Sequence, residues 1–332
     1  MDDLLANSAG ELFTRACPPE VARAIRHGGS AAALWDAIEE SGFLDALVPE
    51  AAGGAGLRPI DTLPVLLAAG RFAAPVPVGE TMLVRAAFAA ARQAAPEGPV
   101  ALAQPVAADA AWRARAAWAR QSRRVLVPRG EAALLLPRPA LPGTDYVNDT
   151  AATMTWEQPE PEAALEGGTD WLVAGAWAEL CRMAGAMDRI LEDTIRYAGE
   201  RVQFGRPIAG FQAVQQQLSV LTEEVFAGRM AAQLASLPSA GEASLDPLRV
   251  AAGKARIGEA AIRVAAIAHG VLGAMGITEE VPLHLMTEQL HRGRLAFGSE
   301  AYWHGVLGRA CLDGPAVTSL GFVQERLAPA EA

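Results

Sequence analysis

An interrupted run of helical sequence in the second half of the chain constrains the fold most strongly. The spacing of apolar residues predicts one continuous helix over 171–201. The helix must then stop, because Gly205 tolerates a positive φ and Pro207 lacks the N–H that a helix requires. Helical spacing resumes beyond this break and predicts a second helix over 208–236. Long helices in a row with short connections favour an up-and-down bundle.

The side chains around this break suit an anion that lies beside a flat ring. Arg201 and Arg206 offer guanidinium groups, Phe204 offers a stacking face, and Gln203 and Gln212 offer amides beside a helix start. The free N–H groups of that helix start and the guanidinium groups both suit phosphate. The alternative is an arginine-rich helix end that complements the macrodipole and is followed by an ordinary turn. That alternative explains Arg201 but not the placement of Phe204 and Gln212.

This segment resembles the flavin-binding helix junction of the acyl-CoA dehydrogenases, in the order Tyr197-x-x-Glu-Arg-x-Gln-Phe-Gly-x-Pro-Ile-x-x-Phe-Gln212-x-x-Gln-x-x-Leu218. The resemblance implies that Arg201, Phe204 and Gln212 hold the pyrophosphate and adenine of an FAD bound by a neighbouring subunit. It also places Gln203 among the cofactor-binding candidates.

The segment over 270–284 resembles the family's glycine-rich turn, which lies against the adenosine end of the flavin. The resemblance implies cofactor contacts at Gly273, Gly276 and Thr278, where the two glycines leave room for close backbone approach. One family position, a glutamine, is glycine in this sequence. His284 either faces the substrate channel, as the resemblance implies, or is an ordinary packed or exposed histidine.

The whole chain predicts a mainly α protein with a small β domain. We expect an N-terminal helical domain over 1–97, a middle β-barrel or sandwich domain over 98–168 and a C-terminal four-helix bundle over 169–332. The expected helices are 31–42, 60–70, 80–95, 171–201, 208–236, 245–272, 280–290 and 296–311. The expected strands are 99–105, 124–128, 132–137 and 152–156, the middle two forming a hairpin.

In the acyl-CoA dehydrogenases the middle β domain lines the flavin. Leu102 and Gln104 stand where the family has a Thr-Glu-Pro segment, so the resemblance implies that this stretch also contacts FAD.

Composition excludes several other classes of protein. The net charge of −10 argues against a nucleic-acid surface and against an anionic membrane partner. The three cysteines form no CxxC pair and fit a reducing, cytoplasmic setting. No signal peptide and no uncharged run long enough to span a membrane is expected. The histidines are not spaced as metal ligands, so no metal is expected.

The expected catalytic base poses the main question. Removal of the α-proton of an acyl-CoA needs a carboxylate in contact with that C–H group. The resemblance places Phe297 at the position of the family's glutamate, and phenylalanine cannot accept a proton. Glu179 and Glu300 are the candidate replacements, and the alternative for each is a solvated surface carboxylate. A partner subunit can also supply the base, or the flavin has been repurposed or lost.

The resemblance implies an FAD-dependent acyl-CoA dehydrogenase of fatty acid metabolism that converts an acyl-CoA to the 2-enoyl-CoA. It also implies a homodimer, a homotetramer or a heteromer with a second acyl-CoA dehydrogenase subunit, with an electron-transfer flavoprotein as the electron acceptor. The alternative is a non-catalytic partner subunit, or a binding protein with a vestigial flavin site.

Overall fold

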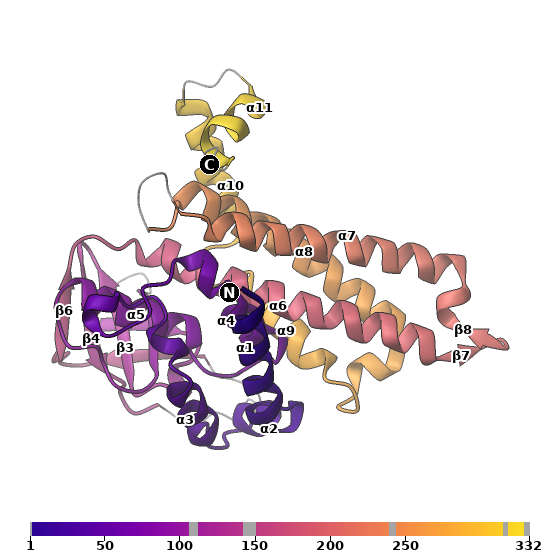
Figure 1. Ribbon diagram of the computed structural model, residues 1–332, viewed down its shortest axis with the longest axis horizontal. Coiled ribbons are helices and arrows are strands. Elements are labelled where there is room, and N and C mark those ends of the chain that lie inside the picture. The colour runs from indigo at the N-terminus through magenta and orange to yellow at the C-terminus, as the bar shows by residue number, and fades with distance from the viewer. Residues whose placement is uncertain (1, 106–111, 142–150, 239–243, 315–317, 329–332) are drawn as a thin grey trace. The chain divides into compact units, whose positions relative to one another are not determined.

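A computed structural model describes residues 2–105, 112–141, 151–238, 244–314 and 318–328 (Figure 1). The described chain is mainly helical with one small β domain, which confirms the expected fold class. It divides into two compact units, the first formed by Met1–Leu66 with Ala74–Ala178 and the second by Leu67–Ala73 with Glu179–Ala332.

The first unit begins with helices, as predicted. They are α1 (Asp2–Ala16), α2 (Pro19–Arg26), α3 (Ala32–Glu40), α4 (Pro59–Arg71), whose last turns belong to the second unit, and α5 (Val78–Ala90). The expected helices over 31–42, 60–70 and 80–95 correspond to α3, α4 and α5, with ends that differ by a few residues. Gly42, with φ 73°, lies in the left-handed region just beyond α3 and allows the chain to turn there.

A six-stranded sheet completes the first unit. Its strands are β1 (Val100–Pro105), β2 (Trp112–Ala116), β3 (Arg124–Arg129), β4 (Ala132–Pro137), β5 (Ala152–Trp156) and β6 (Ala163–Glu166), in the order β5-β2-β1-β3-β4-β6. The expected strands are confirmed, and β3 and β4 form the predicted antiparallel hairpin. The described strands join into one six-stranded sheet, which forms the small β domain of the expected fold class. Its buried face includes Val125, Leu136 and Met154.

The second unit is a bundle around one apolar helix. Its helices are α6 (Trp171–Glu200), which starts in the first unit, α7 (Gln212–Ser236), α8 (Pro247–Leu272), α9 (Leu283–Gly293), α10 (Glu300–Asp313) and the short α11 (Ser319–Phe322). α8 packs against α7, α9 and α10. It starts where Asp246 accepts hydrogen bonds from the backbone N–H groups of Leu248 and Arg249, with Pro247 in its first turn. The bundle expected from long helical runs is therefore present.

The apolar composition of α8 passes a simple test for a membrane span. Residues Pro247–Ile277 are long and apolar enough to cross a membrane, and 44% of the most apolar window is buried. The core helix of a bundle has the same composition, and the contacts of α8 with three other helices are those of a core helix.

Two glycines let the end of α4 cross α6 at very short range within the second unit. A Cβ on Gly70 would lie 1.9 Å from the carbonyl oxygen of Arg182, and a Cβ on Gly185 would lie 1.9 Å from the carbonyl oxygen of Leu67. Any side chain at either position would therefore force the two helices apart. The crossing fixes the part of α6 that carries the buried charged groups described below.

Candidate functional site

The predicted anion-binding segment folds as a small hairpin between α6 and α7. It consists of β7 (Val202–Gln203) and β8 (Arg206–Pro207), followed by a 3₁₀ turn over Ile208–Gly210 (Figure 1). The second helix thus begins at Gln212 rather than at residue 208, which corrects the expected boundary. The reason is that Pro207 and Phe211 both have extended backbones, with ψ of 141° and 132°, so the residues between them form only one tight turn.

The tip of this hairpin carries an exposed aromatic ring, that of Phe204. Phe204 and Gly205 have φ of 51° and 80°, the pair of left-handed residues that a two-residue hairpin turn requires. Glycine adopts this conformation freely, whereas for Phe204 it costs roughly 1–2 kcal/mol. The Phe204 side chain is 92% exposed, so burial within its own chain does not offset that cost. A strained, exposed aromatic residue is typical of a contact made with something outside the chain.

Cationic and amide groups surround this ring. The Arg206 guanidinium lies 4.2 Å from the centre of the Phe211 ring, and the rings of Phe204 and Phe211 meet edge to face at 6.1 Å. Arg201 is exposed at the base of the hairpin, and the Gln203 side chain donates to a carbonyl oxygen within the hairpin. The hairpin and the turn after it therefore bring the two predicted arginines and the predicted ring of Phe204 together with a second ring, that of Phe211.

The hairpin leads directly into the N-terminus of α7. Gln212 is the first residue of α7, and no described side chain caps that helix end. Its first N–H groups and the guanidinium groups of Arg201 and Arg206 together suit a diphosphate. The structure thus brings Arg201, Gln203, Phe204 and Gln212 together, as the sequence predicted.

The glycine-rich turn forms a 3₁₀ segment over Gly273–Ile277. Gly273 has φ 58°, a conformation that glycine adopts without strain. A Cβ on Gly276 would lie 3.1 Å from the Nδ1 of His269, so this glycine already serves packing within the chain. The Thr278 hydroxyl donates to the carbonyl oxygen of Met275 at 2.9 Å. Contacts of these residues with a flavin stay a prediction.

The side chains of the remaining predicted contact residues differ in solvent exposure. The Leu102 side chain is buried in the first unit, while Gln104, also on β1, is half-buried. His284 is half-buried, with its Nδ1 3.2 Å from the carbonyl oxygen of Val281. Only backbone atoms of Leu102 could therefore reach a ligand without repacking.

Phe297, which the resemblance places at the position of the family's base, lies in the α9–α10 turn, residues 294–299. Phe297 is only 4% exposed and has a left-handed φ of 52°. The indole N–H of Trp303 donates to the Phe297 carbonyl oxygen at 3.1 Å. The next residue, Gly298, has φ 96°, and a Cβ there would lie 2.7 Å from the same indole nitrogen. The turn is therefore tightly held, and its central side chain has no proton-accepting group.

Both candidate carboxylates are bound by arginine. Glu179 on α6 is 4% exposed and lies 3.5 Å from the guanidinium of Arg182, so the alternative of a solvated surface carboxylate is wrong for it. Glu300 begins α10 and accepts a 2.6 Å hydrogen bond from the Nε of Arg294. Burial alone would raise the pKa of Glu300, but that hydrogen bond and the nearby cations outweigh it and hold the pKa below its usual value. Glu300 is therefore an ionised, half-buried partner of arginine.

The structure adds one residue that sequence reasoning missed. Lys254 on α8 is 1% exposed, and its ammonium group donates to the carbonyl oxygens of Arg294 and Gly298 at 3.1 and 3.0 Å. Burial lowers its pKa to about 8, although attraction to Glu179 and Glu300 opposes that shift. The available signal was a single lysine within an apolar helix of a chain whose other long cationic side chains are all arginine.

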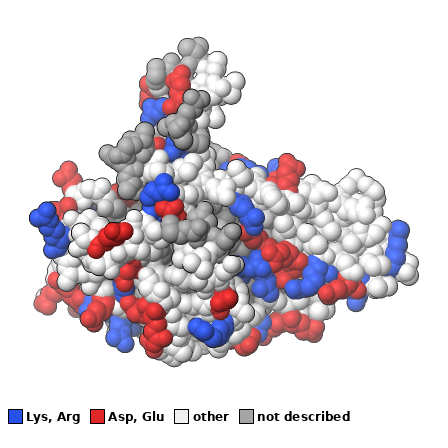
Figure 2. Space-filling view, viewed as in Figure 1, with Lys and Arg blue, Asp and Glu red and all other residues white. Residues whose placement is uncertain are grey.

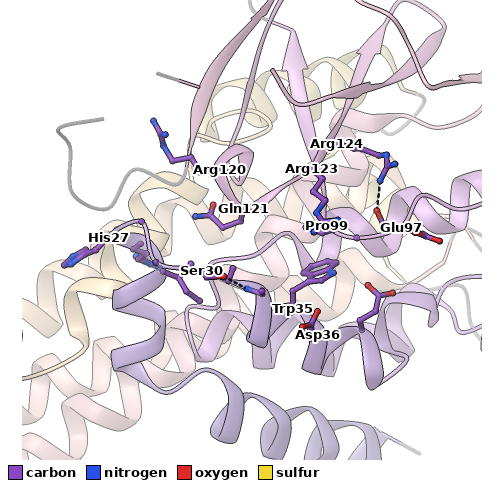
Figure 3. Close-up of a pocket in the computed structure, with 18 of the residues that line it drawn as sticks. His27, Ser30, Trp35, Asp36, Glu97, Pro99, Arg120, Gln121, Arg123 and Arg124 are labelled. Atoms are coloured by element: carbon purple, nitrogen blue, oxygen red, sulfur yellow. Dashed lines mark hydrogen bonds between the residues drawn. The ribbon is translucent and has the colours of Figure 1, made fainter. Parts of the chain in front are cut away.

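A separate cavity of about 1300 Å³ lies within the first unit (Figure 3). Figure 3 shows His27, Ser30, Trp35 and Asp36, from the α2–α3 connection and α3, on one side and Arg120–Arg124 on the other. Its charged lining consists of four arginines, four carboxylates and one histidine: Arg26, Arg120, Arg123, Arg124, Asp36, Glu39, Glu97, Glu162 and His27. This balance favours neither sign of ligand. None of the predicted site residues is among its described lining.

Comparison with known proteins gives matches over most of the chain. The model described as acyl-CoA dehydrogenase, C-terminal domain, matches residues 171–312, and the model for the N-terminal domain of the same family matches residues 2–94. The acyl-CoA dehydrogenase IpdE2 of Mycobacterium tuberculosis is 28% identical over 310 residues, which cover 87% of this chain and 90% of that protein.

Solved structures share the fold. The ChsE4–ChsE5 complex from Mycobacterium tuberculosis superimposes with a TM-score of 0.79 at 22% identity, covering 95% of this chain and 98% of that one. PigA with FAD and proline gives a TM-score of 0.73 at 17% identity, covering 94% and 98%.

Proposed function

The chain belongs to the acyl-CoA dehydrogenase family, and on that premise we propose that it is a subunit of an FAD-dependent enzyme that oxidises an acyl-CoA to the 2-enoyl-CoA. The observation that carries the proposal is the hairpin after α6, with its strained and exposed Phe204 between two arginines.

The donor set at the hairpin fits FAD. Arg201 and Arg206 would bind the pyrophosphate together with the N–H groups at the start of α7, and Phe204 would lie against the adenine. Gln203 and Gln212 would supply amide hydrogen bonds. When bound, FAD supplies the acceptor for the hydride that leaves the β-carbon of the acyl chain. The chain's own contribution at this place is to bind and orient that group.

The surface beside the hairpin supports an assembly of subunits. Residues 212–222 of α7 include no charged side chain, and Figure 2 shows few charges over this part of the molecule. Val220 in this segment is exposed, as are Phe226 and Met230 further along α7. Exposed apolar surface next to a binding hairpin is typical of a protein–protein contact. We propose that a second acyl-CoA dehydrogenase subunit covers this face, so that each flavin contacts two chains.

The missing base favours a heteromer over a homomer. Phe297 cannot accept a proton, and arginine already binds both Glu179 and Glu300. The hydrogen bond from Arg294 helps to hold the pKa of Glu300 below its usual value, so Glu300 is a weaker base than a free carboxylate. We therefore propose that a different partner subunit supplies the base, as its chain would carry the carboxylate that this one lacks. The ChsE4–ChsE5 complex, which shares the fold, is likewise built from two different proteins.

The second candidate function is a non-catalytic subunit that stabilises such a partner. The same observation at Phe297 supports it. In that case the partner alone would bind substrate, while this chain would contribute the hairpin to the partner's flavin. An electron-transfer flavoprotein is the proposed electron acceptor in either case.

The test is the colour and the reactivity of the purified assembly. The protein is expressed alone and with its candidate partner, and absorbance spectra are recorded before and after an acyl-CoA is added. The dehydrogenase proposal expects a flavin spectrum that the acyl-CoA bleaches. A flavin spectrum that no acyl-CoA bleaches would support the non-catalytic role, and a colourless assembly with an intact fold would contradict flavin binding.

A further inference from the structure

The buried ammonium of Lys254 lies at the junction of three helices of the second unit. It projects from α8 and binds two carbonyl oxygens of the α9–α10 turn, those of Arg294 and Gly298. The field of Glu179, on α6, and of Glu300, at the start of α10, attracts it, while the guanidinium of Arg294 repels it. A compact ammonium can donate to both carbonyl oxygens while it stays in the field of both carboxylates, whereas a planar guanidinium presents its donors in a fixed fork.

The turn that Lys254 binds cannot hold its shape through local preference. Phe297 and Gly298 are both left-handed, and a phenylalanine persists in that conformation only where its surroundings enforce it. The described contacts at the turn include the Lys254 hydrogen bonds, the indole of Trp303 on the Phe297 carbonyl oxygen, and the pair between Arg294 and Glu300. Backbone N–H groups of Leu295 and Ala296 also donate to the carbonyl oxygen of Arg292, which joins the turn to the end of α9. Among the side-chain groups, Lys254 comes from α8, so its hydrogen bonds tie the turn to the helix at the centre of the bundle.

We propose that Lys254 is a positioning residue: by binding the carbonyl oxygens of Arg294 and Gly298 it fixes the turn that carries Phe297 and leads into Glu300. Its effect on turnover rests on the function proposed above. Its effect on the turn does not, because that follows from the hydrogen bonds alone.

The first experiment measures amide hydrogen exchange by mass spectrometry in peptides that cover residues 294–299. Lys254→Met removes the ammonium and keeps the length of the side chain. Arg256→Met is the matched control, because it removes a cation two residues along the same helix whose partner is Glu224. Loss of the Lys254 hydrogen bonds should speed exchange in the turn roughly tenfold or more, with the control within about twofold.

Lys254→Arg is a second variant that tests the proposal if Lys254→Met does not fold. It keeps the charge but replaces the compact donor by a planar fork, so we expect faster exchange that is confined to the turn and smaller than in Lys254→Met. Exchange in residues 294–299 that is unchanged in the Lys254 variants, or that rises equally in Arg256→Met, would overturn the proposal.

The second experiment uses the flavin-loaded assembly and follows bleaching by an acyl-CoA. A displaced turn should slow bleaching at saturating acyl-CoA by about tenfold while FAD affinity stays within about twofold. An unchanged bleaching rate in Lys254→Met would overturn the catalytic part of the proposal. A wild-type assembly that never bleaches would instead contradict the proposed function, and the exchange experiment would still test the positioning role.

Discussion

Raising the pH should stabilise the folded chain through Lys254. Burial lowers the pKa of its ammonium from 10.5 to about 8, and the attraction of Glu179 and Glu300 only partly opposes this. Below about pH 8 the amine is charged in both the folded and the unfolded chain, so the folded state carries the full cost of the buried charge. Between about pH 8 and 10.5 the unfolded chain binds a proton that the folded chain does not, so the free energy of unfolding rises with pH.

The size of this effect follows from the pKa difference. A change from 10.5 to about 8 corresponds to about 3 kcal/mol in the free energy of unfolding. Urea denaturation of the wild type and of Lys254→Met at several pH values between 7 and 10.5 measures it, because the other titrating groups cancel in the difference. The wild type should gain about 3 kcal/mol relative to the variant across this window.

The single lysine also allows a direct measurement of the pKa. Protein labelled with carbon-13 at the lysine Cε gives one such signal, which belongs to Lys254. Its titration midpoint should lie at about 8 in the folded chain and near 10.5 in urea. A folded midpoint near 10.5, or a difference between the two denaturation series that stays flat with pH, would refute the reasoning.

Three further substitutions, the first with a matched control, test other parts of the structure. Gly185→Ala should destabilise the fold by about 2 kcal/mol or more in urea denaturation, because its Cβ would meet a carbonyl oxygen of α4 at 1.9 Å. The control is Gly199→Ala on the same helix, which has no described neighbour within 4 Å and should stabilise the fold by about 0.5 kcal/mol. Equal effects of the two substitutions would argue against the close crossing of α4 and α6. Glu224→Gln should cost about 1–3 kcal/mol at pH 7, because it weakens hydrogen bonds from two arginines. Burial alone would raise the pKa of Glu224, but those hydrogen bonds hold the pKa below its usual value. The difference in the free energy of unfolding between wild type and Glu224→Gln should therefore be present above about pH 4.5 and vanish as the pH falls through the lowered pKa. A difference that persists in acid would contradict this. Phe204→Ala should leave the free energy of unfolding within about 0.5 kcal/mol, since the ring is exposed, yet weaken FAD binding in a fluorescence titration, and unchanged binding would remove Phe204 from the site.

Much of the helical fold could be predicted because periodicity and breakers act locally. The long run before Gly205 and Pro207 gave α6 almost to the residue, and Gly42 marked the end of α3. The start of α7 was misplaced by a few residues, because apolar spacing does not reveal that Pro207 and Phe211 are both extended. Helix ends depend on single backbone angles that sequence patterns specify weakly.

The sheet was harder to predict, because strand pairing is set by contacts distant in sequence. β2 was missed although its Trp-Arg-Ala-Arg-Ala sequence alternates, with buried alanines and exposed arginines. β6 has only four residues and follows a proline- and glutamate-rich loop, so it gave little local signal.

In the candidate site too, groups of residues close in sequence could be predicted, whereas groups from distant segments could not. The hairpin residues Arg201, Phe204 and Gln212 are close in sequence, so their spacing alone was enough to group them into one motif. Glu179, Lys254 and Glu300 come from three helices, and only the fold shows that they share one buried region. That difference explains why the sequence grouped the hairpin residues into one candidate site but did not place Lys254 beside Glu179 and Glu300.

The central claim, that the hairpin after α6 grips the diphosphate of FAD, is tested most directly by the FAD dissociation constant of the purified assembly with Arg201→Ala. Arg309→Ala, which removes an exposed arginine from α10, serves as the control. Loss of one charge-assisted phosphate contact costs about 1.5–3 kcal/mol, so Arg201→Ala should weaken FAD binding by about 10- to 100-fold while the control leaves it unchanged. An Arg201→Ala assembly that binds FAD as tightly as the wild type would contradict the account.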